Sequence, residues 1–147
     1  MVKFVGFAES PKPPEGAEMV VVSATLNSDL TQDATAARIF AKTEVSGWLG
    51  AFTKYQLSIG GKLTPVDPST QSEVTFTSVN LPKQVTMISE NFGELQLSTV
   101  KSRGGAEVHL RFSRWVLPEQ RVAFESTAAN LTKRIAAALE VSNGERT

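Results

Sequence analysis

The sequence contains no cysteine and only one histidine, His109. The lack of cysteine excludes disulfides, thiol nucleophiles, iron–sulfur clusters and thiolate zinc sites. A single imidazole excludes a metal site built mainly from histidine and any mechanism that needs two histidines. A phosphate-binding loop, a dinucleotide glycine fingerprint and a Ser-His-Asp pattern are absent as well. We therefore expect neither a metal nor a cofactor.

The chain also lacks an excess of charge and a long hydrophobic run. It has 15 basic and 15 acidic residues, so its formal net charge is zero, which argues against a nucleic-acid partner because phosphate binding needs surplus positive charge. No apolar run approaches the roughly 20 residues that cross a bilayer, so membrane insertion is not expected. The N-terminal segment lacks the apolar core and cleavage site of a signal peptide. We expect a cytoplasmic protein.

The composition indicates one globular domain. The chain has 147 residues, of which 41% are hydrophobic and 20% charged. A chain of this size and composition can bury a core without stabilising disulfides or metal ions. Residues 1–17 include a proline-rich stretch and are interpreted as an N-terminal extension, in which Val2–Ala8 could form a short edge strand. Residues 18–141 form the expected domain, and residues 142–147 a polar tail.

The pattern of hydrophobic residues changes along the chain. Glu18–Leu26 is rich in β-branched residues and is predicted to be a strand. Leu30–Lys42 has helical periodicity, and Glu44–Gly50 suits a single helical turn. A period of two then predicts six strands: Phe52–Ile59, Lys62–Val66, Glu73–Val79, Gln84–Ser89, Glu94–Lys101 and Ala106–Arg114. A long helix is predicted from Pro118 to about Glu140, and this segregation of helices and strands indicates the α+β class.

The last helix carries one apolar stripe that can cover the sheet. Its members recur every three or four residues: Phe124, Ala128, Leu131, Ile135 and Leu139. Ala128 is small and stands between larger side chains. Small residues over a curved sheet can leave a hollow, or they can let the helix and the sheet approach closely, and the sequence leaves both possibilities open.

The segment Ala36–Leu63 resembles a known family. Its Trp48-Leu49-Gly50 group and its Gly-Gly pair at Gly60 and Gly61, together with the later Gly104-Gly105 hairpin, are similar to the activators of heat-shock chaperone ATPase. That family lies within the START-like, birch-pollen-allergen-like superfamily (SRPBCC), and the resemblance covers about residues 18–140.

The resemblance implies a helix-grip fold. In that fold a curved antiparallel sheet of about six to seven strands wraps around a long C-terminal helix, and two short helices follow the first strand. A cavity often lies between the sheet and the helix. Members bind lipids, sterols, polyketides or other apolar molecules, some are cyclases or hydrolases, and the eukaryotic namesakes bind a chaperone.

We therefore expect binding of an apolar or amphipathic small molecule (lipid-like, polyketide-like or aromatic) between the sheet and the C-terminal helix. Tyr55 is the candidate polar contact. The residues predicted to line the cavity are Tyr55, Met87, Leu97, Leu110, Phe112, Phe124, Ala128, Leu131 and Ile135.

Two alternatives remain at this point. A cyclase, dehydratase or hydrolase of the same superfamily would need a polar group of perturbed ionisation inside the cavity. An interaction protein would contact a chaperone or another chain through its outer surface, at the two short helices or near Phe92 and Trp115. The protein could be a monomer or a homodimer.

Other conspicuous residues have simpler explanations. His109 falls on the outer sheet face and is expected to be solvated. Trp48 is expected to anchor the core, and Phe92 and Trp115 to pack at the rim. Glu90 and Glu94 flank a turn, where a solvated hairpin explains them better than paired acid/base catalysis.

Overall fold

The computed structural model describes residues 14–145 of the chain, with the side chains of residues 14–140. Most of the N-terminal extension, including the expected strand Val2–Ala8, lies outside the described residues. Among the described helices, none has both the length and the apolar character needed to span a membrane.

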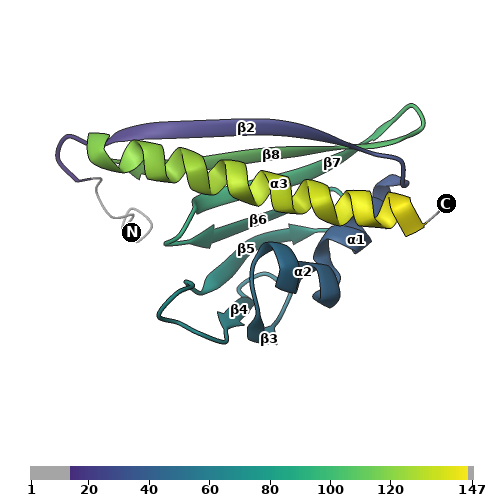
Figure 1. Ribbon diagram of the computed structural model, residues 1–147, viewed down its shortest axis with the longest axis horizontal. Coiled ribbons are helices and arrows are strands. Elements are labelled where there is room, and N and C mark those ends of the chain that lie inside the picture. Colours follow the sequence, from purple (N-terminus) through teal and green to yellow (C-terminus); the bar gives the residue numbers. More distant parts are fainter. Residues whose placement is uncertain (1–13, 146–147) are drawn as a thin grey trace, which may run out of the picture.

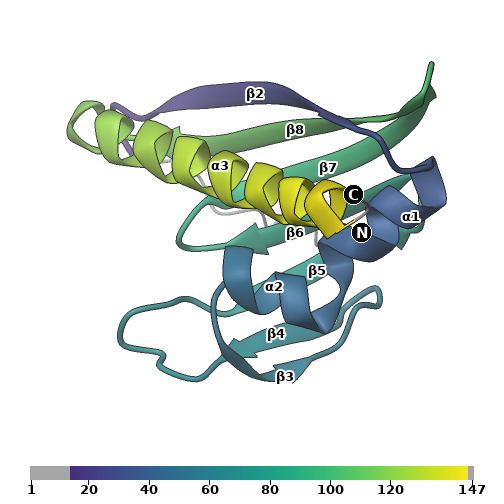
Figure 2. The same ribbon diagram turned by 45° about the vertical axis from the view of Figure 1, so that its right-hand side comes forward.

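The structure has the α+β helix-grip architecture (Figures 1 and 2). Within the described residues the strands form one antiparallel seven-stranded sheet in the order β2-β8-β7-β6-β5-β4-β3. The long helix α3 runs across one face of this sheet. The elements are β2 (Glu18–Ser28), α1 (Gln32–Phe40), α2 (Lys42–Trp48), β3 (Phe52–Tyr55), β4 (Lys62–Pro65), β5 (Val74–Asn80), β6 (Gln84–Ser89), β7 (Gly93–Ser102), β8 (Gly105–Val116), the short 3-10 helix η2 (Pro118–Gln120) and α3 (Arg121–Glu145).

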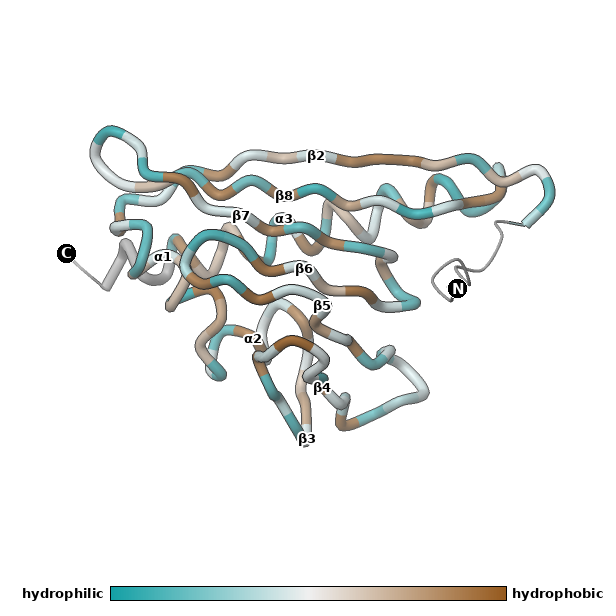
Figure 3. The backbone as a smooth tube through the Cα atoms, turned by 180° about the vertical axis from the view of Figure 1, so that it is seen from behind, coloured by the Kyte–Doolittle hydropathy of each residue, from teal (hydrophilic) through white to brown (hydrophobic). Residues whose placement is uncertain are grey.

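Alternating side chains give the sheet an inner and an outer face. On the inner face Leu95 lies opposite Phe112 and Met87 lies opposite Leu95, and all three are fully buried. Viewed from behind, the strands alternate between hydrophobic and hydrophilic residues (Figure 3). The predicted stripe of α3 is buried against the inner face, as its spacing indicates.

Helix α3 is longer than its sequence suggests. The polar composition after Glu140 predicts an end near that residue, but the backbone stays helical to Glu145. Polar residues do not stop a helix whose earlier turns are already formed, because propagation is far easier than nucleation.

The short helices are fixed to the core by one aromatic side chain. Trp48, at the end of α2, is 1% exposed, and its indole N–H donates a hydrogen bond of 2.9 Å to the carbonyl of Ile39 in α1. Its ring meets that of Phe40 edge-on at 6.1 Å. The prediction that Trp48 anchors the core is confirmed.

Candidate functional site

A pocket of about 350 Å³ opens between the start of α3 and the adjoining end of the sheet. The β6–β7 turn forms one wall, the end of β8 a second, and the first turns of α3 a third. The pocket is lined by Glu90, Asn91, Arg114, Val116, Glu119, Gln120, Ala123, Phe124 and Thr127.

The lining of this pocket is amphipathic. Val116, Ala123 and Phe124 give it an apolar part. Arg114 adds a guanidinium, and Glu90 and Glu119 add carboxylates. Within residues 14–140 none of these three charged groups forms an ion pair with another. Their hydrogen-bonding capacity is therefore available to a ligand.

The β6–β7 turn holds the stem of Arg114 in place. Gly93 has φ of +76°, and a Cβ there would lie 2.5 Å from the carbonyl oxygen of Ser113 and 2.8 Å from the Cβ of Arg114. Only glycine lets the turn come this close to β8 at a positive φ. The turn thereby fixes the base of the arginine side chain at the pocket wall.

A second pocket of about 170 Å³ lies on the other side of the β6–β7 turn. Asn91 borders both pockets, so the turn separates them. The second pocket also touches α2, the β4–β5 loop and the middle of α3. Its lining is Trp48, Leu49, Gly50, Thr70, Gln71, Ser72, Val74, Ser89, Asn91, Phe92, Leu131 and Arg134.

The side chains predicted to line a ligand cavity lie mostly within one continuous core. Phe124 borders the first pocket and Leu131 the second. Six others, which fill the core between the sheet and α3, are at most 1% exposed: Met87, Leu97, Leu110, Phe112, Ala128 and Ile135. That a ligand reaches these six stays a prediction.

Arg114 is a residue of the pocket that sequence reasoning missed. It follows Leu110 and Phe112 at the spacing of two that places side chains on one face of β8. A charged residue on an otherwise apolar inner face was therefore a visible signal. Glu90 also lines the pocket, but it borders a hollow of the outer face beside Ile88 as well, and Glu94 lies on that outer face opposite Ile88.

Tyr55 makes a structural contact. Its hydroxyl donates a hydrogen bond of 2.9 Å to the carbonyl of Phe40 at the end of α1. Its ring is flanked by Phe52 at 5.3 Å and Phe76 at 5.9 Å. Burial raises the pKa of Tyr55 to about 12. The side chain thus ties β3 to α1, away from both pockets described above.

This contact predicts a specific pH dependence. Tyr55 is the only tyrosine of the chain, so phenolate absorbance reports its titration directly. Because its pKa rises on folding, the folded state holds the proton more tightly, and stability should fall as the pH rises from about 10 towards 12. The Tyr55→Phe variant should lose about 0.5–1.5 kcal/mol at neutral pH and decline less over that range. A phenolate titration near pH 10 in the folded protein would contradict the assignment.

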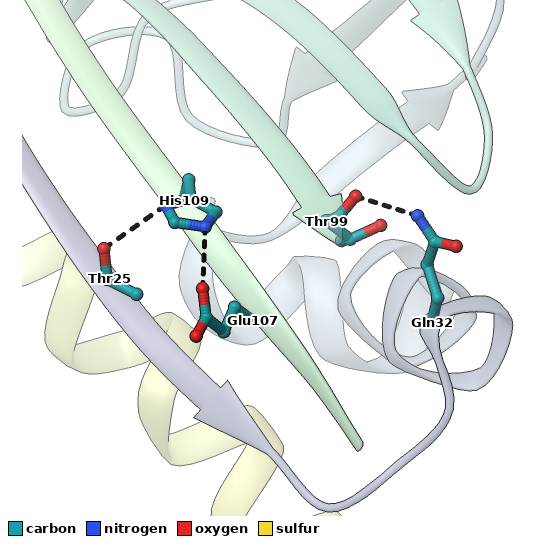
Figure 4. Close-up of polar contacts among 5 residues, drawn as sticks. All are labelled: Thr25, Gln32, Thr99, Glu107 and His109. Atoms are coloured by element: carbon teal, nitrogen blue, oxygen red, sulfur yellow. Dashed lines mark hydrogen bonds and ion pairs between the residues drawn. The ribbon is translucent and has the colours of Figure 1, made fainter. Parts of the chain in front are cut away.

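His109 belongs to a surface network on the outer face (Figure 4). Its Nδ1 lies 3.3 Å from the hydroxyl of Thr25, its partner across β2 and β8, and its Nε2 lies 3.1 Å from a carboxylate oxygen of Glu107. Both the imidazole and this carboxylate are well exposed. The expectation of a solvated histidine is confirmed, and the network links two strands.

In the same view Gln32 donates a hydrogen bond of 2.8 Å to the carbonyl of Thr99, which joins α1 to β7.

Phe92 and Trp115, the two aromatic residues expected to pack at the rim, differ in their exposure to solvent. Phe92 is 2% exposed, as expected for packing, but Trp115 is 46% exposed, so rim packing is wrong for Trp115. Trp115 follows the outward-facing row of β8, where it lies opposite the exposed Met19 of β2. With the neighbouring Val21 these residues form a small apolar surface beside the edge of the sheet.

Comparison with known proteins locates the fold. No known family profile and no curated protein sequence matches the chain. Among solved structures, an AHSA1-like protein from Aeromonas hydrophila is 16% identical, with a TM-score of 0.62 over 84% of this chain and 94% of that one. A protein of unknown function from Staphylococcus aureus is 11% identical, with a TM-score of 0.67 over 87% and 98% of the two chains.

A protein from Bacillus halodurans gives a TM-score of 0.66 at 11% identity, over 84% of this chain and 99% of that one. These similarities span nearly the whole of each neighbour, and at such low sequence identity they show a shared fold and not a shared function. The chain therefore shares the helix-grip fold of these solved structures, which is the fold that the resemblance in its sequence implies.

Proposed function

We propose that the protein binds a small amphipathic molecule in the pocket at the start of α3. The observation that carries the proposal is the meeting of an apolar wall with a guanidinium that has no ionic partner among the described residues. The volume of about 350 Å³ lies at the lower end of the range for small-molecule sites, roughly 300–1,000 Å³.

The lining indicates the class of ligand. An aromatic or lipid-like group would pack against Val116, Ala123 and Phe124, and an acidic group would pair with Arg114. The carboxylates of Glu90 and Glu119 are acceptors, so hydroxyl or amine donors on the ligand would complete the contacts. The helix-grip fold supports this proposal, because members of the START-like superfamily that the sequence resembles often have a cavity between the helix and the sheet.

A filling substitution tests the site. Anilinonaphthalene sulfonate is a suitable probe because it joins an aromatic system to an anionic group. Ala123→Phe should weaken its binding at least tenfold, because the new ring occupies the volume at the pocket wall. The matched control is Ala129→Phe, an exposed position on the same helix that borders neither described pocket. Fluorescence titration of both variants measures the difference.

The charge is tested separately. Arg114→Gln should weaken sulfonate binding about tenfold, the equivalent of losing a charge-assisted contact of roughly 1.5 kcal/mol. If Ala123→Phe and Ala129→Phe bind the probe equally well, this pocket is not the binding site. Native mass spectrometry of the purified protein would then show whether it retains any small molecule elsewhere.

A further inference from the structure

The two pockets follow one another along helix α3. Thr127 borders the first pocket and Leu131 the second, so the pockets are about one helical turn apart. Asn91 of the β6–β7 turn borders both. Four of the α3 residues that line them recur at spacings of three or four, which places them on one face of the helix: Phe124, Thr127, Leu131 and Arg134. Both pockets therefore lie along the same face of α3.

The second pocket is too small to hold a whole ligand. Its volume of about 170 Å³ falls below the range of small-molecule sites, roughly 300–1,000 Å³. The first pocket, at about 350 Å³, is near the lower limit, and the two together fall well within the range. A ligand that extends from the first pocket past Asn91 would fill both.

The linings of the two pockets differ in charge. The first pocket has one guanidinium and two carboxylates. Among the described residues that line the second pocket, Arg134 carries the one charge, and the polar side chains beside it are uncharged: Thr70, Gln71, Ser72, Ser89 and Asn91. Since no described carboxylate of this lining repels a negative charge, the second pocket favours an acidic group more strongly than the first.

The polar wall of the second pocket is held in place at a glycine. Gly50 has φ of +104°, and a Cβ there would overlap the side-chain amide of Gln71. Glycine thus lets this amide approach the backbone closely, and its nitrogen donates a hydrogen bond to the carbonyl of Leu49. The same nitrogen carries a second N–H, which can donate to an acidic oxygen in the pocket.

The second pocket also has an apolar part. Trp48, Phe92 and Leu131 line it, and each is at most 4% exposed. Trp48 comes from α2, which lies beside α3 (Figure 2). A hydrocarbon segment that enters from the first pocket would therefore keep apolar contacts until its polar end reaches Arg134.

We propose that the two pockets form one elongated site for a molecule with an apolar middle and an acidic group at each end. Arg114 would hold one acidic group, and Arg134 with Gln71 would hold the other. The inference rests on the function proposed above and specifies the class of its ligand. Phe124 and Arg134 are ten residues apart, about 15 Å along the helix, so the two acidic groups would be separated by a similar distance.

A matched pair of acids tests the second acidic group. Tetradecanedioic acid and tetradecanoic acid have the same chain length, which is close to that of the site, and differ by one carboxyl group. Isothermal titration calorimetry on the full-length chain should show the diacid binding about tenfold more tightly than the monoacid. Arg134→Gln should reduce this ratio to about twofold or less, because the second carboxylate then has no guanidinium to pair with.

Lys133→Gln is the matched control. It removes the same charge from the adjacent position of α3, which borders neither pocket, and should leave the ratio of the two affinities unchanged. Ala123→Phe, which fills the first pocket, should weaken the binding of both acids about tenfold or more.

The elongated site is wrong if the wild-type protein binds the two acids equally or binds neither. It is also wrong if Arg134→Gln and Lys133→Gln give the same ratio, or if Ala123→Phe leaves diacid binding unchanged. The function proposed above fails separately, through the fluorescence titration of Ala123→Phe and Ala129→Phe. A sulfonate probe that responds to Ala123→Phe, in a protein without preference for the diacid, would retain the first pocket and exclude its extension.

Discussion

Replacing Trp48 with alanine should lower the free energy of unfolding by about 3–5 kcal/mol. The indole is 1% exposed and packs against Phe40, so its removal leaves a cavity where α2 meets the core. The carbonyl of Ile39 also loses its side-chain donor, and an unsatisfied buried acceptor adds to the penalty. Both effects act on the link between the short helices and the sheet.

The magnitude can be measured by urea unfolding followed by far-ultraviolet circular dichroism. Trp48→Phe keeps an aromatic ring beside Phe40 but lacks the N–H donor, so it should lose only about 1–2 kcal/mol. Trp115→Ala is the matched control, because this second tryptophan is 46% exposed, and it should change stability by less than about 1 kcal/mol. Equal losses for the two tryptophan-to-alanine variants would refute the anchoring role of Trp48.

The Gly93→Ala substitution should destabilise the protein by about 2–4 kcal/mol and weaken binding in the proposed pocket. Its φ of +76° is unfavourable for alanine, and the added Cβ would lie 2.5 Å from the backbone oxygen of Ser113. Relief requires the β6–β7 turn to move away from β8. That movement would also release the stem of Arg114 from its position at the pocket wall.

Gly104→Ala separates the two contributions. Gly104 has a similar φ of +86°, but a Cβ there meets no atom within 4 Å. This variant should therefore lose only about 1 kcal/mol, the penalty for left-handed backbone. Thermal unfolding and titration with anilinonaphthalene sulfonate measure both variants. If they are equally stable, close packing at the β6–β7 turn does not matter, and the argument for a fixed Arg114 fails.

The strands could be predicted from the sequence because their alternation is regular. Val108, Leu110 and Phe112 are separated by polar residues, and all three are buried on the inner face. The stripe of α3 was equally clear, since Phe124 and Ile135 recur at helical spacing. These patterns depend on local periodicity, which the backbone geometry of each element fixes independently of its neighbours.

The candidate site was less predictable. Apolar residues at inner positions suggested a hollow along the middle of α3, but Ala128 is fully buried in the core there. A small residue can leave space or allow close approach, and only the distance between helix and sheet decides which occurs. The pocket of the proposed site lies at the end of the sheet, where Arg114 and the β6–β7 turn meet the first turns of α3, and of the predicted cavity residues it includes Phe124.

The sequence by itself determined the α+β class, the order of the elements, the faces of the strands and the absence of thiol chemistry, because composition and periodicity are local properties of the chain. Tertiary structure alone decided that Trp115 is exposed, that the hydroxyl of Tyr55 is bound to Phe40, and where the pockets lie. Each of these depends on how closely elements distant in the sequence approach one another, and that distance is set by packing the whole core.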